Sequence, residues 1–402
     1  MKGGPGAGRG PSATANASWE QVTAFRLSRH HLIERAPLSS LASIPGDIGG
    51  AQAQLLSAGE LSLWARVKGA RLSDIDDAIW KDRTIVKAWC MRRTMFLVPA
   101  AELSLFVRGS AMRAEREIRW VTSKGVPQSK VEEVVARVLD ALDEPTTTTD
   151  LAVKLTNSGR YKLRYKTGGV GWGNRKKVPW VDFGGLALPA NYLLHLAAAR
   201  GVFCSGPGLG NESTFVRADR WIPHWRDTPR ATAERELVKR YLGAYGPSTP
   251  SDFAIWTGMT TVDARRVWSF VEPEMAQVEV EGRRASVLES DLDELMGVPA
   301  TGPVVRLLPF FDSFLLGRRS HRDVVTAEDH TKVYRPQGWV SPVLLVDGRA
   351  SGVWSHSRSG KSLKVQVNPF ARLSSEVSAL VRAEVEQLAQ FFDCPEATVR
   401  IR

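Results

Sequence analysis

Ile85-Val-Lys-Ala-Trp-Cys-Met-Arg-Arg-Thr-Met-Phe-Leu-Val-Pro99 is the stretch that decides the fold of this chain. Residues 85–89 and 94–98 are rich in β-branched and apolar side chains, which predicts two short strands, the second of which ends at Pro99. Helical patterns precede these strands. Helices followed by such strands are typical of a winged helix.

The same pattern of helices followed by a short hairpin recurs three times, and this repetition is the main indication of the fold class. We expect an α+β protein with three tandem winged helices and a C-terminal region rich in β-strands. The expected units are 18–127 for the first winged helix, 128–228 for the second with a basic insertion, 229–300 for the third, and 301–402 for the C-terminal region. Residues 1–17 are expected to be a disordered tail, since Gly, Ala, Pro and Ser dominate its sequence.

Several elements inside these units have specific signals. The capping-box sequence Ser18-Trp-Glu-Gln21 predicts that a helix begins at residue 19. The glycines of 206–210 predict a turn between two strands, and residues 338–346 predict one strand. A hairpin is expected over 353–367 around Gly360, and the apolar stripe of residues 374–391 predicts a terminal helix that packs on the core.

Two glutamines, Gln52 and Gln54, stand where a loop becomes a helix, directly after Gly49 and Gly50. Residues two apart do not share a face of a helix, so only a non-helical or first-turn backbone, which the glycines allow, lets both amides converge on one target. A helix is expected from about residue 53 to residue 67. A carboxamide does not ionise, so the pair could hold a water or a sugar by hydrogen bonds but could not act as an ordinary general base. The alternative is a pair of solvated amides in a helix cap.

Positive charge predicts a polyanionic partner. Lys and Arg number 54 against 43 for Asp and Glu, which gives a formal charge of +11 and makes nucleic acid the first candidate. Between residues 154 and 177 no acidic residue occurs, and basic residues alternate with aromatic and apolar ones. On a strand, this alternation would give one basic side suited to phosphate contacts. An exposed loop that merely adds solubility is the alternative, since it has the same composition. The candidate DNA contacts are Arg92 and Arg93; Arg160, Lys162, Arg164, Lys166, Arg175, Lys176 and Lys177; Arg318, Arg319 and Arg322; and His356, Arg358 and Lys361, which surround the turn of the C-terminal hairpin.

Other classes of protein are disfavoured by what the sequence lacks. No apolar run approaches the ~20 residues of a spanning helix, and the N-terminus has no signal-peptide core, so no membrane partner is expected. Cys90, Cys204 and Cys394 lie far apart, without metal-ligand spacing or a secreted disulfide pattern, which predicts a reduced, cytoplasmic setting. Because dinucleotide, phosphate-loop and HExxH motifs are absent, we expect no cofactor and no metal.

Two carboxylates are alternative catalytic groups. Asp312 lies among apolar residues, where burial would raise the pKa of an acid or base, but a cap or a bridge to a core arginine is the favoured role. Asp47 precedes the glycines and is expected to accept backbone N–H bonds near the helix start.

Five segments in order resemble one family. They are Ala51–Gln54, Met91–Pro99, Arg240–Pro247 with Asp252–Trp256, Leu307–Asp312, and Asp347–Trp354. Over nearly its whole length after Ser18, the chain is similar to the AlkZ/YcaQ-like winged-helix DNA glycosylases. The resemblance implies winged helices around a concave DNA-binding face, with a Gln-X-Gln catalytic motif that corresponds to Gln52 and Gln54. Many relatives have histidine where this chain has Phe96, so any role of that histidine does not transfer.

The resemblance also implies a reaction. It points to a monomeric, cytoplasmic and nucleoid-associated glycosylase that hydrolyses the N-glycosidic bond of N7-alkylated guanines in double-stranded DNA and unhooks azinomycin-type interstrand crosslinks, giving DNA repair and antibiotic self-resistance. An N7-alkylated guanine is cationic and leaves as a neutral base, so neutral side chains that place a water are sufficient. The alternative is a non-catalytic winged-helix regulator that binds DNA and releases no base.

Overall fold

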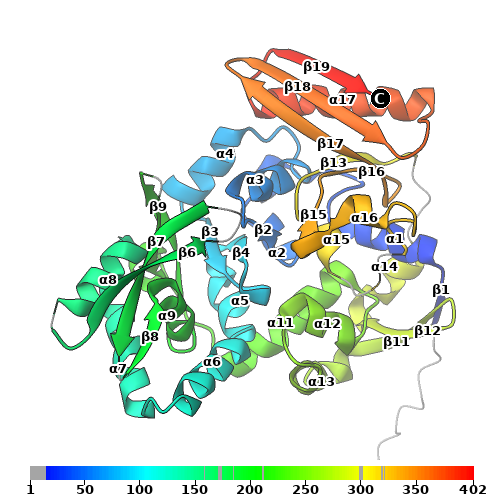
Figure 1. The fold of residues 1–402 in the computed structure, drawn as a ribbon. Coiled ribbons are helices and arrows are strands. Elements are labelled where there is room, and N and C mark those ends of the chain that lie inside the picture. Colours follow the sequence, from blue (N-terminus) through cyan, green and yellow to red (C-terminus); the bar gives the residue numbers. More distant parts are fainter. Residues whose placement is uncertain are drawn as a thin grey trace, which may run out of the picture.

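The computed structural model describes residues 15–157, 159–170, 174–183, 185–210, 212–297, 302–317, 320 and 322–402, without the side chains of residues 113, 168–170 and 174–176. It has a mixed α+β fold. In Figure 1 the N-terminal unit lies in the middle, the second unit at the left, the third at the lower right and the C-terminal sheet on top.

The first unit surrounds a three-stranded sheet of order β2-β4-β3. The elements of residues 18–127 are α1 (Trp19–Arg29), α2 (Ile44–Asp47), β2 (Ala51–Gln52), α3 (Leu56–Trp64), α4 (Leu72–Asp76), β3 (Ile85–Trp89), β4 (Met95–Pro99), α5 (Leu103–Gly109) and α6 (Met112–Ser123). Of these, α1 places Val22 and Phe25 in a separate core with Val278 of the third unit. Both predicted strands are confirmed, and β3 pairs antiparallel with β4 so that Lys87 lies opposite Leu97. The predicted capping box is confirmed too, because Ser18 Oγ accepts from Gln21 N at 3.2 Å and Gln21 Oε1 accepts from Ser18 N at 2.9 Å.

The expectation of a disordered tail over residues 1–17 is wrong for its last three residues. β1 (Ala15–Ala17) pairs in parallel with β11 (Met275–Val280), with Ala15 opposite Val278. The edge of β11 offers unpaired backbone groups, and Ala17 is buried in a small core with Phe25. Three residues therefore order themselves through a partner about 260 positions away, while residues 1–14 lie outside the described residues.

The second unit contains two sheets. Its elements are α7 (Gln128–Ala141), β5 (Thr146–Thr147), α8 (Thr148–Thr156), β6 (Lys162–Val170), β7 (Asn174–Phe183), β8 (Leu186–Pro189), α9 (Ala190–Ala197), β9 (Phe203–Leu209), β10 (Glu212–Arg217) and α10 (Ala218–Trp221). One sheet has the order β5-β10-β9, and the basic insertion forms the other, β6-β7-β8. The predicted turn at 206–210 is wrong over most of its length, because residues 206–209 continue β9, with Gly206 paired to Thr214.

The third unit forms a sheet of order β1-β11-β12 beside its helices. Its elements are α11 (Arg230–Tyr245), α12 (Pro250–Thr257), α13 (Thr261–Ser269), β11, β12 (Arg283–Leu288) and α14 (Leu292–Gly297). Thr249 Oγ1 caps α12 by accepting from Asp252 N at 3.3 Å, and Pro250 occupies the first turn.

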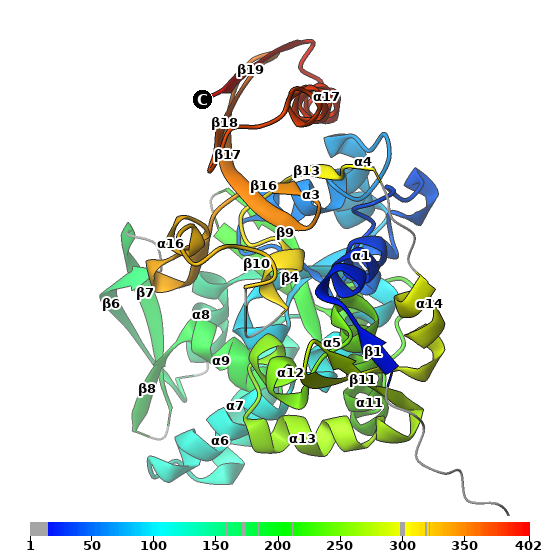
Figure 2. The same ribbon diagram turned by 90° about the vertical axis from the view of Figure 1, so that its right-hand side faces the viewer.

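The C-terminal region is built on a five-stranded sheet of order β13-β16-β17-β18-β19, with α17 against one of its faces (Figure 2). Its elements are β13 (Val305–Leu308), α15 (Ser313–Leu316), α16 (His330–Val333), β14 (Tyr334–Arg335), β15 (Trp339–Val340), β16 (Val343–Val346), β17 (Arg349–Ser359), β18 (Ser362–Pro369), α17 (Ser375–Phe391) and β19 (Glu396–Ile401). The predicted hairpin around Gly360 and the terminal helix on the core are confirmed. The single strand predicted over 338–346 is wrong: it breaks at Pro342, which has no N–H to donate, into β15 and β16 of different sheets.

Hydrophobic cores join units that are far apart in sequence. One core packs Trp64 and Leu97 of the first unit with Phe314 and Phe391 of the C-terminal region. A second core joins β3 and β4 to α11 and α12. The first unit is thus enclosed by the units that follow it. Within the described ranges, no helix combines the length and apolarity that crossing a bilayer requires.

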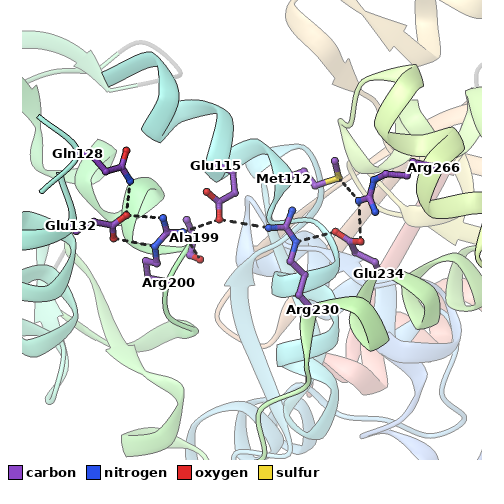
Figure 3. A network of polar contacts seen from close by, with 9 residues as sticks. All are labelled: Met112, Glu115, Gln128, Glu132, Ala199, Arg200, Arg230, Glu234 and Arg266. Atoms are coloured by element: carbon purple, nitrogen blue, oxygen red, sulfur yellow. Dashed lines mark hydrogen bonds and ion pairs between the residues drawn. The ribbon is translucent and has the colours of Figure 1, made fainter. Parts of the chain in front are cut away.

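A chain of ion pairs ties the second unit to the third across α6 (Figure 3). Arg200 contacts Glu132 at 2.7 Å and Glu115 of α6 at 2.8 Å. Arg230 lies 3.6 Å from the same Glu115 and 2.9 Å from Glu234. Because Glu115 is shared by two arginines, the network links the two units more firmly than one surface pair would.

Candidate active site

The loop that carries the two glutamines is bent by two glycines. Gly49 and Gly50 have φ values of 69° and 93°, which L side chains rarely adopt. A Cβ at Gly50 would lie 2.9 Å from the ring of Phe96, so the glycine also permits close packing. The two residues turn the chain from α2 into β2 and leave Gln52 and Gln54 in a non-helical segment before α3. The helix expected from about residue 53 begins only at Leu56, so Gln54 lies before its first turn.

Residues from other units hold this loop in place. Tyr245 Oη on α11 donates to the carbonyl of Ile48 at 3.2 Å, and Ser313 Oγ donates to the carbonyl of Gly50 at 2.6 Å. The ring of Trp256 packs against Gly49, where a Cβ would come within 3.0 Å of it. These three residues were missed by sequence reasoning, because nothing local links them to the loop. A resemblance that spans Arg240–Trp256 and Leu307–Asp312 was the one available signal.

Both glutamines are anchored by one short segment, Arg92–Met95. Gln52 Oε1 accepts from Arg92 Nη2 at 3.1 Å, and Gln54 Oε1 accepts from the backbone N–H of Met95 at 3.3 Å. Gln52 is buried, with 7% of its surface exposed, whereas Gln54 is exposed. A guanidinium and a backbone amide can only donate, so the side-chain atom that faces each of them must be the amide oxygen. The orientation of both carboxamides is therefore determined chemically.

Arg92 and Arg93, expected as DNA contacts, both have protein partners. Arg92 Nη1 also donates to the backbone carbonyl of Trp256. Burial lowers the pKa of Arg92 to about 10. Arg93 lies 2.7 Å from Glu117 and over the ring of Tyr192. Arg92 is thus placed with the glutamines rather than on an open basic surface.

The expected basic row lies on the exposed strand β6. Lys162, Arg164 and Lys166 are exposed, while Leu163 packs on the core of the second unit. Arg164 is 3.2 Å from Asp182 of β7, and Lys166 Nζ lies 4.0 Å above the ring of Trp180. The strand presents a basic side, as alternation predicted, but an acidic partner occupies part of it.

The other basic candidates are scattered more widely. Arg160 lies 3.1 Å from Glu133 and so is paired within its own unit. Lys177 and Arg322 are exposed. The side chains of Arg175 and Lys176, and the whole of Arg318 and Arg319, lie outside the described residues.

The C-terminal hairpin carries its basic residues differently from root to tip. His356 stacks between Trp354 and Phe392, with ring centroids 5.4 Å from each. Burial and the charge of Arg358 lower the pKa of His356, and Arg358 itself lies over Phe392. Lys361 at the turn is exposed. The hairpin therefore has packed side chains at His356 and Arg358 and an exposed basic residue at its turn.

The two carboxylates proposed as alternatives have structural partners. Asp312 forms a bidentate pair with buried Arg66, at 2.7 and 2.9 Å, and caps α15 through the N–H of Phe314. This confirms the favoured role of Asp312 as a cap and a partner for a core arginine. Contrary to the expectation, Asp47 accepts no backbone N–H bond within the part of the chain that the structure describes. It contacts His31 Nε2 at 3.0 Å instead.

Glu60 on α3 is a carboxyl group that sequence reasoning missed. Burial raises its pKa to about 7, the charge of Asp76 adds to the rise, and Lys87 and Arg358 oppose it. Cross-strand pairs put Lys87 with Leu97 and Gln52 with Phe96, and adjacent residues of β4 point to opposite faces of the sheet. Glu60 is therefore associated with the face of the sheet opposite Gln52. Among the described residues, no three His, Cys, Asp or Glu side chains gather closely enough to hold an ion.

Comparisons with known proteins agree with this architecture. A family model described as DNA glycosylase AlkZ-like matches residues 46–391. The interstrand DNA cross-link repair glycosylase of Streptomyces sahachiroi is 33% identical over 352 residues, which cover 84% of this chain and 88% of that protein. The solved structure of Streptomyces sahachiroi DNA glycosylase AlkZ superposes with a TM-score of 0.75 and 28% identity, covering 96% of this chain and 100% of that one.

Proposed function

The chain belongs to the AlkZ-like family of DNA glycosylases, and from this premise we propose that it releases N7-alkylated guanines from DNA and unhooks interstrand crosslinks joined through such bases. The observation that carries the proposal is the pair of carboxamides, Gln52 and Gln54, fixed by donors in a clamped loop. Family membership disfavours the alternative of a non-catalytic regulator.

The lesion itself supplies the activation of the leaving group. Alkylation at N7 makes the guanine cationic, so cleavage of the N-glycosidic bond releases a neutral base without a general acid. The protein then has to place a water below C1′ and accommodate positive charge on the sugar. Each amide oxygen accepts one protein hydrogen bond and keeps a second lone pair, so Gln52 and Gln54 can hold the water and the deoxyribose.

A crosslinked base requires an accessible site. Because the base stays tethered to the other strand, it cannot rotate fully out of the duplex into a tight pocket. Gln54 is exposed and lies just before α3. An exposed side chain can reach a base that stays close to the DNA duplex. The relative whose name specifies interstrand cross-link repair supports this substrate, and azinomycin-type crosslinks are the lesion we propose.

The proposed mode of DNA binding uses the whole molecule. We propose that the three units with three-stranded sheets act as winged helices around a concave face that a monomer presents to the duplex. The exposed side of β6 and the tip of the C-terminal hairpin would contact the backbone, with Lys361 entering the minor groove. A cytoplasmic, nucleoid-associated enzyme that gives self-resistance to an alkylating antibiotic is the role this implies.

Single-turnover excision tests the assignment. Gln52→Ala and Gln54→Ala are each expected to slow release of N7-methylguanine, and of base from a crosslinked duplex, by about a hundredfold or more, while DNA affinity changes little. The assay is run with excess enzyme in chelator, and liberated base is quantified. Glu60→Gln is the control, since it alters a nearby polar group associated with the other face of the sheet. Full rates in both glutamine variants would refute the catalytic role.

A further inference from the structure

We propose that Arg92 is a positioning residue that sets the orientation of the Gln52 amide for base excision. The inference rests on the proposed catalytic role of Gln52 and adds a residue that acts through it. The sequence predicted Arg92 to be a phosphate contact. Its surroundings point to a different task.

The guanidinium of Arg92 spans two acceptors. Nη2 donates to Gln52 Oε1 at 3.1 Å, and Nη1 donates to the backbone carbonyl of Trp256 at the end of α12. A planar fork can serve two acceptors in fixed directions, whereas the single ammonium of a lysine cannot reproduce that geometry. Gln52 is thereby linked through Arg92 to a helix of the third unit.

The backbone is shaped to deliver this side chain. Arg92 and Arg93 have φ values of 53° and 59°, a conformation that costs free energy for residues other than glycine. Gly258, the residue that ends α12, makes room for the turn, because a Cβ there would lie 3.1 Å from Arg92 Cα. The ring of Phe96 supports the guanidinium at 5.5 Å. Two successive residues in the left-handed conformation thus direct the Arg92 side chain towards Gln52.

Arg92 is half-buried and has no carboxylate partner among the described residues, which also distinguishes it from a structural ion pair. Desolvation lowers its pKa, and both groups that it contacts are neutral carbonyl oxygens. An arginine kept only for stability would gain more from a carboxylate, as Arg66 does from Asp312. Because Gln52 Oε1 faces Arg92, the NH₂ group of the same amide points away from Arg92. Loss of Arg92 would let the amide rotate about the Cγ–Cδ bond of Gln52.

The experiment measures excision rate and DNA affinity separately in Arg92→Met and Arg92→Lys. With enzyme saturating, the single-turnover rate is expected to fall by about 10- to 100-fold in both variants, while Kd changes by less than about threefold. In a Gln52→Ala background, Arg92→Met should slow the reaction no further, because a residue that acts through Gln52 has no effect once Gln52 is gone.

Arg83→Met is the matched control. Arg83 also has a left-handed backbone, with φ of 54°, lies over the ring of Trp221 and donates to the carbonyl of Trp221 at 3.2 Å, but no glutamine contact joins it to the site. It should keep the wild-type saturating rate. Thermal unfolding of each variant identifies any general loss of folding, and Arg92→Lys preserves charge and length if Arg92→Met is unstable.

Several outcomes would overturn the inference. A normal saturating rate in Arg92→Met, with weaker binding and a shallower salt dependence, would make Arg92 a phosphate contact instead. Additive losses in the double variant would show that Arg92 acts independently of Gln52. If Gln52→Ala itself excised at the full rate, the catalytic role of Gln52 on which this inference rests would fail first, and if Gln54→Ala did so as well, the proposed function would fail with it. The failures are therefore distinguishable.

Discussion

Glu60 is the carboxyl group that a general-base mechanism would use in place of the two glutamines. Its pKa of about 7 would suit a base, yet its charged neighbour Lys87 belongs to the side of the sheet away from Gln52. A mechanism based on glutamines predicts an excision rate that is flat between about pH 6 and 8, because no catalytic group titrates there.

Glu60→Gln should separate stability from catalysis. The folded-state pKa of Glu60 lies above the ordinary value, so its contribution to stability is present below about pH 4.5 and is lost as pH rises through about 7. The variant should therefore be more stable than the wild type above pH 7, by at most about 3 kcal/mol and by less after solvent screening, with an unchanged excision rate. Urea unfolding at pH 5 and pH 8 measures the first effect. A large loss of excision in this variant would favour carboxylate catalysis.

At the scale of the element, the basic residues of β6 face a carboxylate on the neighbouring strand β7. Asp182 on the neighbouring strand lies directly opposite Lys162 and holds Arg164 at 3.2 Å. Such a partner reduces the charge that the row offers to a phosphate.

Asp182→Asn should therefore strengthen DNA binding. Removal of the carboxylate frees Arg164, so Kd is expected to fall about two- to fivefold and the salt dependence to steepen by up to about one unit of slope. Lys162→Ala on the same strand side is the control in the opposite direction and should weaken binding. Fluorescence anisotropy at several salt concentrations measures both. An unchanged Kd in both variants would mean that this side of the insertion does not face DNA.

At the scale of the whole molecule, the excess of positive charge predicts strongly salt-dependent binding. If about six phosphates are contacted, affinity for duplex DNA should fall about a thousandfold between about 50 and about 200 mM salt. Anisotropy titrations on undamaged duplex test this, since the term is independent of sequence and lesion. A nearly flat response would exclude DNA as the main partner of the basic surface.

The ion-pair chain of Figure 3 links the second unit to the third. Glu115 connects Arg200 of the second unit to Arg230 of the third, so the strand that bears the basic row is held at a fixed angle to the clamped glutamine loop. In the proposed mode of DNA binding, phosphate contacts on the second unit would place a lesion at the loop that the third unit packs against.

The amino-acid sequence by itself determined the features that depend on near neighbours. The two strands around Arg92, the capping box at Ser18 and the hairpin around Gly360 follow from side-chain alternation, cap chemistry and glycine conformation within a few residues. The turn of the chain before Gln52 also followed from local chemistry, because two glycines precede it, but the helix expected from about residue 53 begins only at Leu56.

Only the tertiary structure decided what each side chain touches across the chain. Arg92, predicted as a DNA contact, donates to Gln52, and the last residues of the tail pair with β11. Tyr245 and Ser313 hold the loop from positions about 200 and about 260 residues further along. The local sequence pattern determines which backbone conformations have low free energy. Partners so distant in sequence are selected by the burial of apolar surface and the satisfaction of buried polar groups, and both are properties of the packed molecule alone.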